Sequence, residues 1–344
     1  MSLPAAMRTQ AAACGALGSP FMARLLTVLA DHWPATSALA MRCNDWSGDI
    51  GPSGASLPLR IAGGLHALVL SGRDAALHDA YLPASVSDAE LAATVLPALD
   101  RHRDFLLNWI ENAPQTNEIR RSAALIPALH WLSARHPGLP LHLSELGASA
   151  GLNLMCDRFA LDTTPGRLGP ADPALSLSPD WTGPLPPEMP VTVASRRGVD
   201  LNPLDPHNQD HRLRLFSYLW PDQPHRVELT RAAIAVHNAV VDRGDAIDWL
   251  RDRLAEQRAD GLHLIYHTVA WQYFPTDRQD AGRKLIEAAG ERATPEAPLA
   301  WLGMEADDRP GDGAALTLRL WPADLRVTLA RVDFHGRWVR WQAS

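Results

Sequence analysis

The chain has 344 residues, enough for one large domain or two modest ones. Its 46% hydrophobic and 21% charged residues are ordinary for a globular protein. The formal net charge of -7 argues against broad binding to nucleic acid or to an anionic membrane, because both need a basic face.

The three cysteines, Cys14, Cys43 and Cys156, lie far apart and show no paired spacing. This pattern fits a reducing compartment and predicts neither a disulfide framework nor a zinc site. Neither a signal peptide nor an 18-residue apolar span is visible, so we expect a cytoplasmic protein that binds no membrane. Lys284 is the only lysine, so a Schiff-base mechanism would have to use it.

Residues 1–138 predict an all-helical region. Apolar helical patterns cover residues 21–30 and 58–70, and a capping box, Ser87-Asp-Ala-Glu90, opens a helical pattern that extends to Ile110. Another helix is predicted for residues 117–136, where Pro137-Gly138 is a stop signal. No strand is predicted before residue 139.

From residue 139 onward, short apolar runs alternate with helical patterns, which implies a parallel sheet. The predicted strands cover, in order, residues 141–146, 191–200, 239–241, 262–267 and 299–304, with helices such as 246–257 and 277–289 between them. Two later runs, 316–321 and 327–332, leave no room for a helix and predict an antiparallel pair. His335-Gly-Arg-Trp338 then predicts a turn.

The fold class predicted is therefore α/β, with the helical region at 1–138 and a Rossmann-like domain at 139–344. The Pro-rich, polar segment 162–190 would be an excursion between the first and second strands, forming a small hairpin or a lid.

A small-residue turn, Gly147-Ala-Ser149-Ala-Gly151, follows the first strand and fits the Gly-x-Ser-x-Gly nucleophile elbow. A triad could join Ser149 to an aspartate such as Asp200 and to His267 or His335. However, a hydrolase elbow follows several strands and an oxyanion loop, whereas only helices precede this one. A dinucleotide fingerprint is also poorly matched, because Leu152 stands where the third glycine should be.

A cofactor cradle is the other interpretation. Methyltransferases that use S-adenosylmethionine place Glu/Asp-x-Gly-x-Gly-x-Gly after the first strand, and Glu145-Leu-Gly147-Ala-Ser149-Ala-Gly151 is similar, with serine at the middle glycine. Small residues would let the ligand lie against the backbone, and the following helix N-terminus, near Asn153, would hold its carboxylate. Asp200, ending the second strand, would bind the ribose, and Asp245-Ala246, after the third, would contact the adenine. In such folds the ribose-binding acid usually lies about 20 residues after the glycine-rich turn. Asp200 lies much farther along the chain, and the inserted segment 162–190 must explain the difference.

His267 ends the fourth strand, where it would serve either as a general base or as a packing histidine. Trp271 and Tyr273 would line an acceptor pocket or pack in the core, and we take His267 and Tyr273 as the catalytic candidates. His207 and His211, with Asp205 nearby, have metal-ligand spacing, but no third strong ligand is in local sequence and no metal site is predicted.

Together, these motifs resemble an uncharacterised, mainly bacterial group, domain-of-unknown-function family 2332, over nearly the whole chain. The matching segments are Leu65-His66, Tyr81-Leu-Pro83, Gly147–Asn153, Asp157-Arg158, Arg197–Pro203 with Asp205, Trp220-Pro221 with Arg226, Gly244–Ala246, His267-Thr268 with Tyr273, and His335–Trp338. The resemblance implies a methyltransferase-type Rossmann-like core and leaves the activity open.

The leading hypothesis is therefore an S-adenosylmethionine-binding methyltransferase that acts on a small or medium acceptor. A non-catalytic ligand-binding or interaction protein on the same fold is the second hypothesis, and a serine hydrolase that uses Ser149 is the third.

Overall fold

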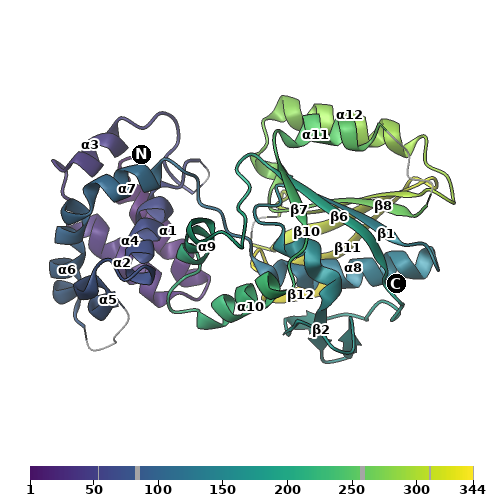
Figure 1. Ribbon diagram of the computed structural model, residues 1–344, viewed down its shortest axis with the longest axis horizontal. Coiled ribbons are helices and arrows are strands. Elements are labelled where there is room, and N and C mark those ends of the chain that lie inside the picture. Colours follow the sequence, from purple (N-terminus) through teal and green to yellow (C-terminus); the bar gives the residue numbers. More distant parts are fainter. Residues whose placement is uncertain (53, 82–85, 256–259, 310, 344) are drawn as a thin grey trace. The chain divides into compact units, whose positions relative to one another are not determined.

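Figure 1 shows the computed structural model, which describes residues 1–52, 54–81, 86–255, 260–309 and 311–343. The chain divides into two compact units, Met1–Thr116 with Asp205–Glu228, and Asn117–Leu204 with Leu229–Ser344. The sequence suggested one division near residue 138. In the structure the segment that precedes the first strand belongs to the second unit, and a later helical segment belongs to the first.

The first unit is helical, as predicted. Its helices are α1 (Leu3–Ala16), α2 (Pro20–Asp31), α3 (Ala38–Asn44), α4 (Leu57–Leu70), α5 (Ala75–Tyr81), α6 (Asp88–Arg101), α7 (Arg103–Ile110) and α9 (Gln209–Ser217), while α10 (Pro224–Ala235) begins in it. The capping box at Ser87 and Glu90 is formed. The helical pattern from 87 to 110 is split at His102, whose ring lies 2.9 Å from the buried Asp74 carboxylate.

The later helical segment joins this unit through α4. Most of α4 is buried, as expected for a helix that is apolar nearly all round. Gly63 lets α9 approach, because a Cβ there would lie 2.6 Å from the Tyr218 ring. The ring Nδ1 of His66 lies 3.1 Å from the carbonyl oxygen of Ser217. Of the family-like motif at Tyr81-Leu-Pro83, only Tyr81 lies within the described residues, and it is buried.

The second unit contains a mixed sheet in which, among the described residues, nine strands pair. The predicted parallel strands are present as β1 (Leu141–Leu146), β6 (Val193–Asp200), β7 (Val240–Arg243), β8 (Leu262–Thr268) and β9 (Leu299–Glu305). The predicted antiparallel pair is β10 (Ala314–Trp321) and β11 (Leu325–Val332). Antiparallel pairing also joins β10 to β9 and β11 to β12 (Trp338–Trp341), so the antiparallel part is larger than predicted.

The parallel strands lie in the order β7-β6-β1-β8-β9. When these five strands are numbered along the chain, their order is 3-2-1-4-5, which is the order of doubly wound nucleotide-binding sheets. The second and third strands lie on one side of the first strand, and the fourth and fifth lie on its other side. The carboxyl ends of β1 and β8 therefore border the switch point, the place where such sheets bind ligands.

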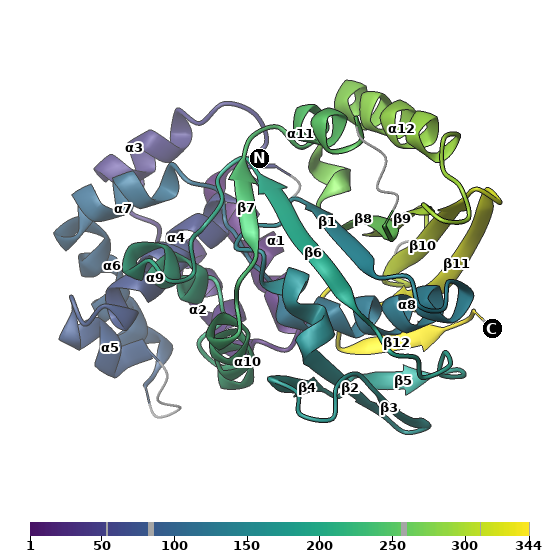
Figure 2. The same cartoon turned by 45° about the vertical axis from the view of Figure 1, so that its right-hand side comes forward.

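Helices cover both faces of this sheet. Figures 1 and 2 show α11 (Ala246–Arg253) and α12 (Thr276–Gly290) together on one face and α8 (Ser122–Arg135) on the other. Leu146, Val199 and Ile265 pack in one apolar cluster with Ile247 of α11 and Ile286 of α12. Side chains alternate along a strand, so Glu145, next to Leu146, points to the opposite face. The predicted end of the helix at 246–257 lies partly outside the described residues.

The excursion between β1 and β6 explains why Asp200 comes late in the chain. After a 3-10 helix, η2 (Leu152–Arg158), the strands β2 (Phe159–Thr163), β3 (Gly166–Leu168) and β4 (Leu175–Leu177) form a small sheet. The next strand, β5 (Asp180–Thr182), joins the large sheet beside β12 (Figure 2). The excursion thus contains a hairpin, formed by β2 and β3, which is one of the two forms that the sequence suggested. The hairpin belongs to the small sheet, and the excursion also supplies an edge strand of the large sheet.

Within the described residues, the structure contains no helix that is long and apolar enough to cross a membrane.

Candidate functional site

The candidate site is the loop between β1 and η2, together with the carboxyl ends of β6, β7 and β8. Gly147, Ser149 and Gly151 all have left-handed backbone conformations, with φ of 71°, 54° and 70°. The N–H groups of Gly147 and Ala148 donate to the carbonyl oxygen of Val199 at 2.9 and 3.0 Å. These bonds fasten the loop to the end of β6.

The small residues of this loop are needed for packing between protein segments. A Cβ on Gly147 would lie 2.6 Å from the Cβ of Ala270, which follows β8. A Cβ on Gly151 would lie 2.7 Å from the side chain of Val241 on β7. The loop is therefore pressed between its neighbours, a different reason for glycine from the ligand approach that the motif suggested.

The α-helix predicted to start after Gly151 is absent, and the 3-10 helix η2 takes its place. The N–H of Leu152, at its start, donates to Oδ1 of Asn117 at 2.9 Å. The buried Asn153 amide accepts from the Ser122 hydroxyl at 2.7 Å and donates to the Glu118 carbonyl at 3.2 Å. Asn117 and Asn153 thus bind η2 to the segment that leads into α8. A ligand contact by Asn153 stays a prediction.

Asp200 is the last residue of β6 and is half-buried. Its Oδ2 accepts the N–H of Ser149 at 2.9 Å, and its Oδ1 accepts the N–H of Asn202 at 2.9 Å. The structure therefore brings two predicted site residues, Ser149 and Asp200, into direct contact.

Asp245 caps the N-terminus of α11, which begins at Ala246. Its Oδ1 accepts the N–H groups of Ile247 and Asp248 at 2.8 and 3.1 Å and also contacts Arg278. The pKa of Asp245 lies below its ordinary value: partial burial raises it, but the Arg278 and backbone hydrogen bonds outweigh that effect. In the part of the chain that the structure describes, Oδ2 accepts no hydrogen bond, so one oxygen of this carboxylate is available to a ligand.

Glu145 is buried on the α8 side of β1, with 2% of its surface exposed. Burial raises its pKa to about 8, although the Tyr266 hydroxyl and the positive charge of Arg121 act in the opposite direction. The Tyr266 hydroxyl donates to Oε2 at 3.3 Å. This carboxyl group therefore links β1, two residues before the loop, to β8.

His267, at the end of β8, is fully hydrogen-bonded. Its Nδ1 lies 2.7 Å from Oε1 of Glu305, and its Nε2 accepts the indole N–H of Trp301 at 3.0 Å. An indole only donates, so Nε2 must carry the lone pair and Nδ1 the proton. His267 is therefore a neutral imidazole whose two nitrogens are both engaged, and Trp271 stacks on it at 5.0 Å. This arrangement favours the packing interpretation, and a role as general base stays a prediction.

Glu305, which the sequence analysis missed, organises the end of β8. It accepts the backbone N–H groups of Ala270, Trp271 and Gln272 at 3.0 to 3.3 Å as well as the His267 bond. Burial raises its pKa, but these hydrogen bonds outweigh burial and hold the pKa below its ordinary value. The available sequence signal was an acid ending the fifth predicted strand.

Backbone strain lies beside these groups. Val269 has φ of 53°, a region that a β-branched residue rarely occupies and that costs on the order of 1–3 kcal/mol. Its N–H donates to the Met304 carbonyl at 2.8 Å, and the preceding Thr268 carbonyl accepts from Arg121 at 3.0 Å. Strain of this kind concentrates at functional sites. Tyr273, four residues later, is 61% exposed, and its predicted catalytic role is untested.

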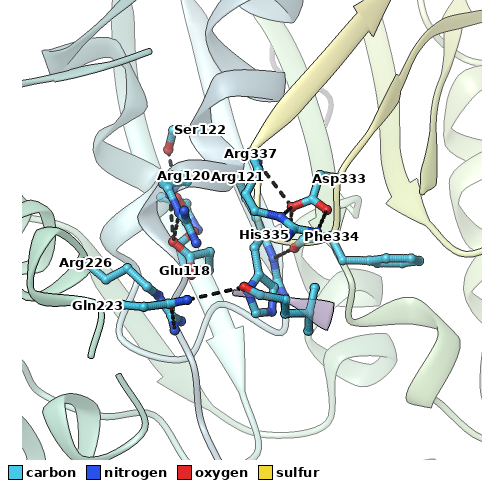
Figure 3. Close-up of polar contacts among 12 residues, drawn as sticks. Glu118, Arg120, Arg121, Ser122, Gln223, Arg226, Asp333, Phe334, His335 and Arg337 are labelled. Carbon is cyan, nitrogen blue, oxygen red and sulfur yellow. Dashed lines mark hydrogen bonds and ion pairs between the residues drawn. The ribbon is translucent and has the colours of Figure 1, made fainter. Parts of the chain in front are cut away.

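Figure 3 shows how the segment 118–121 meets the turn after β11. Arg121 donates through Nε to the Phe334 carbonyl at 3.0 Å. Asp333 accepts the backbone N–H of His335 at 3.0 Å and pairs with Arg337 at 2.7 Å. Gly336 has φ of 68°, and a Cβ there would lie 2.1 Å from the Arg120 carbonyl. The predicted turn is present, and its contacts with Arg120 and Arg121 favour the structural interpretation.

Among the described residues, no general base forms a hydrogen bond with Ser149, the nucleophile of the hydrolase hypothesis. Oγ of Ser149 is buried and has no hydrogen-bond partner among the residues whose positions are described. A serine nucleophile needs a base within hydrogen-bond reach.

The histidine pair in the helical unit is also engaged: Nδ1 of His211 accepts the backbone N–H of Asp205 at 3.0 Å. No group of three His, Cys, Asp or Glu side chains suited to a metal ion occurs in the described ranges.

One family model, described as an uncharacterized protein conserved in bacteria, matches residues 4–341, nearly the whole chain. No curated protein and no solved structure matches it. The residues that suggested the resemblance, from Leu65-His66 to the turn at 335–338, lie along this match. The chain therefore belongs to domain-of-unknown-function family 2332.

Proposed function

We propose that the protein binds S-adenosylmethionine at the carboxyl ends of β1, β6 and β7 and transfers its methyl group to a small or medium acceptor. One observation carries the proposal: the five parallel strands lie in the order 3-2-1-4-5, with the loop at Gly147–Gly151 on the central first strand. Sheets of this order bind nucleotide-like ligands at that end.

Two acidic side chains could bind the adenosine group of the cofactor, Asp200 at its ribose and Asp245 at its adenine. Asp200 is half-buried beside the loop, and a carboxylate oxygen can accept two hydrogen bonds, so its backbone contacts are compatible with ribose hydroxyls. After the neighbouring strand, at the N-terminus of α11, Asp245 has Oδ2 available for the adenine amino group. The buried Oγ of Ser149 is a polar atom that a ligand against this loop would pair.

Other candidates support the site without touching the ligand. Glu145 and Asn153 are buried and bound to protein groups, so they position the β1 loop and η2. Bound S-adenosylmethionine supplies an activated methyl group, and the protein's part is to align it with the acceptor. Since both nitrogens of His267 are engaged, an acceptor that needs no general base fits best, and Tyr273 remains a candidate contact.

A second candidate function is ligand binding without turnover. Both ring nitrogens of His267 are hydrogen-bonded within the protein, so this side chain has no free nitrogen to accept a proton from a substrate. This observation favours binding without turnover. The two functions differ in one observable: only a methyltransferase converts S-adenosylmethionine to S-adenosylhomocysteine when an acceptor is supplied.

Calorimetric titration of single-site variants tests the cofactor assignment. Asp200→Ala and Asp245→Ala should each weaken S-adenosylhomocysteine binding by about 10- to 100-fold, the value of one hydrogen bond to a charged group. Asp252→Ala, an exposed acid on α11, is the matched control and should bind normally. Melting curves without ligand establish that each variant is folded. Unchanged affinity in both site variants would remove the assignment.

A further inference from the structure

A cleft of about 440 Å³ lies between α12 and the sheet face formed by β9, β10 and β11. Its volume is in the range of small-molecule sites. The groups used below are the aromatic pair Trp271 and Trp301, the cations Arg283 and Arg326, and the hydroxyls of Thr317 and Thr328. None of them belongs to the β1 loop or to the ends of β6 and β7.

The floor of the cleft includes side chains from one face of β10, along which buried and more exposed side chains alternate. Leu316, Leu318 and Leu320 are buried, whereas Thr317 is exposed. The pairing of β10 with β11 places Thr317 directly opposite Thr328. Two threonine hydroxyls therefore lie side by side on an exposed sheet face, where they can donate to one acceptor group.

One wall is aromatic. The rings of Trp271 and Trp301 are 5.4 Å apart, and both lie near His267. Gly303 makes room for this packing, because a Cβ there would lie 2.8 Å from the His267 ring. These contacts hold the Trp301 indole at the edge of the cleft, where it offers a flat apolar surface.

Most charges lining the cleft are already paired. Glu305 keeps its negative charge, but both of its oxygens are engaged by the hydrogen bonds described above. Arg319 lies 2.5 Å from both Glu287 and Asp324. Arg283 is the exception. It is exposed on α12, 5.9 Å from the centre of the Trp301 ring, and within the described chain it forms no ion pair or hydrogen bond. Arg326, on the opposite rim, is 3.6 Å from Asp324.

We propose that this cleft binds a small aromatic anion, an aryl carboxylate or aryl phosphate. The anionic group would pair with the Arg283 guanidinium and accept from the hydroxyls of Thr317 and Thr328. The ring would lie against Trp301. The guanidinium group of arginine can bind a carboxylate or a phosphate through two parallel hydrogen bonds. A cationic ligand would be repelled by the positive charge of Arg283. The proposal uses no side chain that is assigned to the cofactor, and Trp271 is its one residue beside the end of β8.

Thermal melting and calorimetric titration with simple probes test this proposal. Benzoate, phenyl phosphate and indole-3-acetate are the anionic probes, and benzyl alcohol and benzylamine are the neutral and cationic controls. At least one anion should bind saturably and raise the melting temperature, while the two controls should not. Comparison of the three anions separates carboxylate from phosphate recognition.

Variants on neighbouring residues of α12 locate the binding. Arg283→Gln should weaken the best anion about tenfold or more. Lys284→Gln removes the adjacent exposed cation, which does not line the cleft, and should bind as the unmodified protein does. Because Arg283 forms no ion pair, its variant should melt normally without ligand. Saturable binding by none of the anions, or equal affinity in Arg283→Gln, would overturn the proposal.

Discussion

Tyr266 donates a hydrogen bond to Glu145 across the paired strands β8 and β1, over 3.3 Å, and both side chains are buried. Glu145 lies two residues before Gly147, and Tyr266 precedes His267, so both belong to strand ends that lead into the candidate site. Burial raises the pKa of Glu145 to about 8, so near neutral pH the carboxyl group is mostly protonated. A protonated acid at this depth avoids the cost of burying a charge.

The first prediction concerns how stability depends on pH. The pKa of Glu145 is raised from 4.5 to about 8 on folding. Its contribution is therefore fully present below pH 4.5 and is lost as the pH rises toward 8, because the unfolded chain releases the proton first. The loss approaches 1.4 kcal/mol per pH unit. Glu145→Gln still accepts the Tyr266 bond but cannot ionise, so it should lack this loss. Urea denaturation at pH 5, 6.5 and 8 measures the difference.

Tyr266→Phe is the control for that experiment, because it removes the donor but keeps the ionisable group. It should retain the fall in stability between pH 5 and 8. If Glu145→Gln loses stability over this interval as the unmodified protein does, the assignment of a raised pKa to Glu145 is wrong.

The second prediction separates packing from backbone conformation at Gly147. Gly138 and Gly147 both have positive φ, but a Cβ on Gly138 would meet nothing within 4 Å. Gly138→Ala should therefore cost only the conformational penalty, about 1–2 kcal/mol. Gly147→Ala adds a clash with Ala270 and should cost about 1–3 kcal/mol more. Equal losses on thermal denaturation would show that the loop is not pressed against the end of β8.

The third prediction concerns Glu305. Glu305→Ala leaves three backbone N–H groups and the Nδ1–H of His267 without their acceptor, so it should cost about 3–5 kcal/mol. Glu305→Gln keeps one acceptor oxygen and should cost less. Glu296→Ala, at an exposed acid in the same unit, should change stability little. A Glu305→Ala loss no larger than that of Glu296→Ala in denaturant titration would contradict the role given to Glu305.

The fourth prediction concerns the cysteines, which are free and buried. Burial raises the pKa of Cys14 and of Cys43 to about 11, and the pKa of Cys156 also lies well above its ordinary value because of burial. The thiolate is the reactive form, so a disulfide reagent at pH 7.5 should label none of the three in the folded protein and all three in denaturant. Rapid labelling of the folded protein would show that a thiol is accessible.

The strands were predictable where burial is continuous. Leu141–Leu146 was predicted with its observed bounds, because leucines recur through the segment and a small-residue turn follows it directly. The structure buries both faces of β1, including its polar residues His142, Ser144 and Glu145. The strand at Val240–Arg243 gave a weaker signal, since it lies at the sheet edge and is only partly buried.

The division of the chain into two units and the long-range hydrogen bonds of the candidate site were less predictable. Asp205–Glu228 belongs to the helical unit because of contacts such as Gly63 with Tyr218, which no local pattern reveals. The acids at the strand ends were found from their positions after predicted strands, although Asp200 lies farther along the chain than is usual. Glu305 and Arg121 were missed, because their importance depends on distant partners, the backbone of 270–272 and the Thr268 carbonyl.

Calorimetric titration of the unmodified protein, together with its melting curve, tests the central claim most directly. The ligands are S-adenosylmethionine and S-adenosylhomocysteine, with NAD and ATP as controls. We predict saturable binding of the first two alone, and at 100 times the dissociation constant a stabilisation of about 2.7 kcal/mol. Absence of binding by both, or equal binding of NAD or ATP, would contradict the cofactor proposed for the β1 loop.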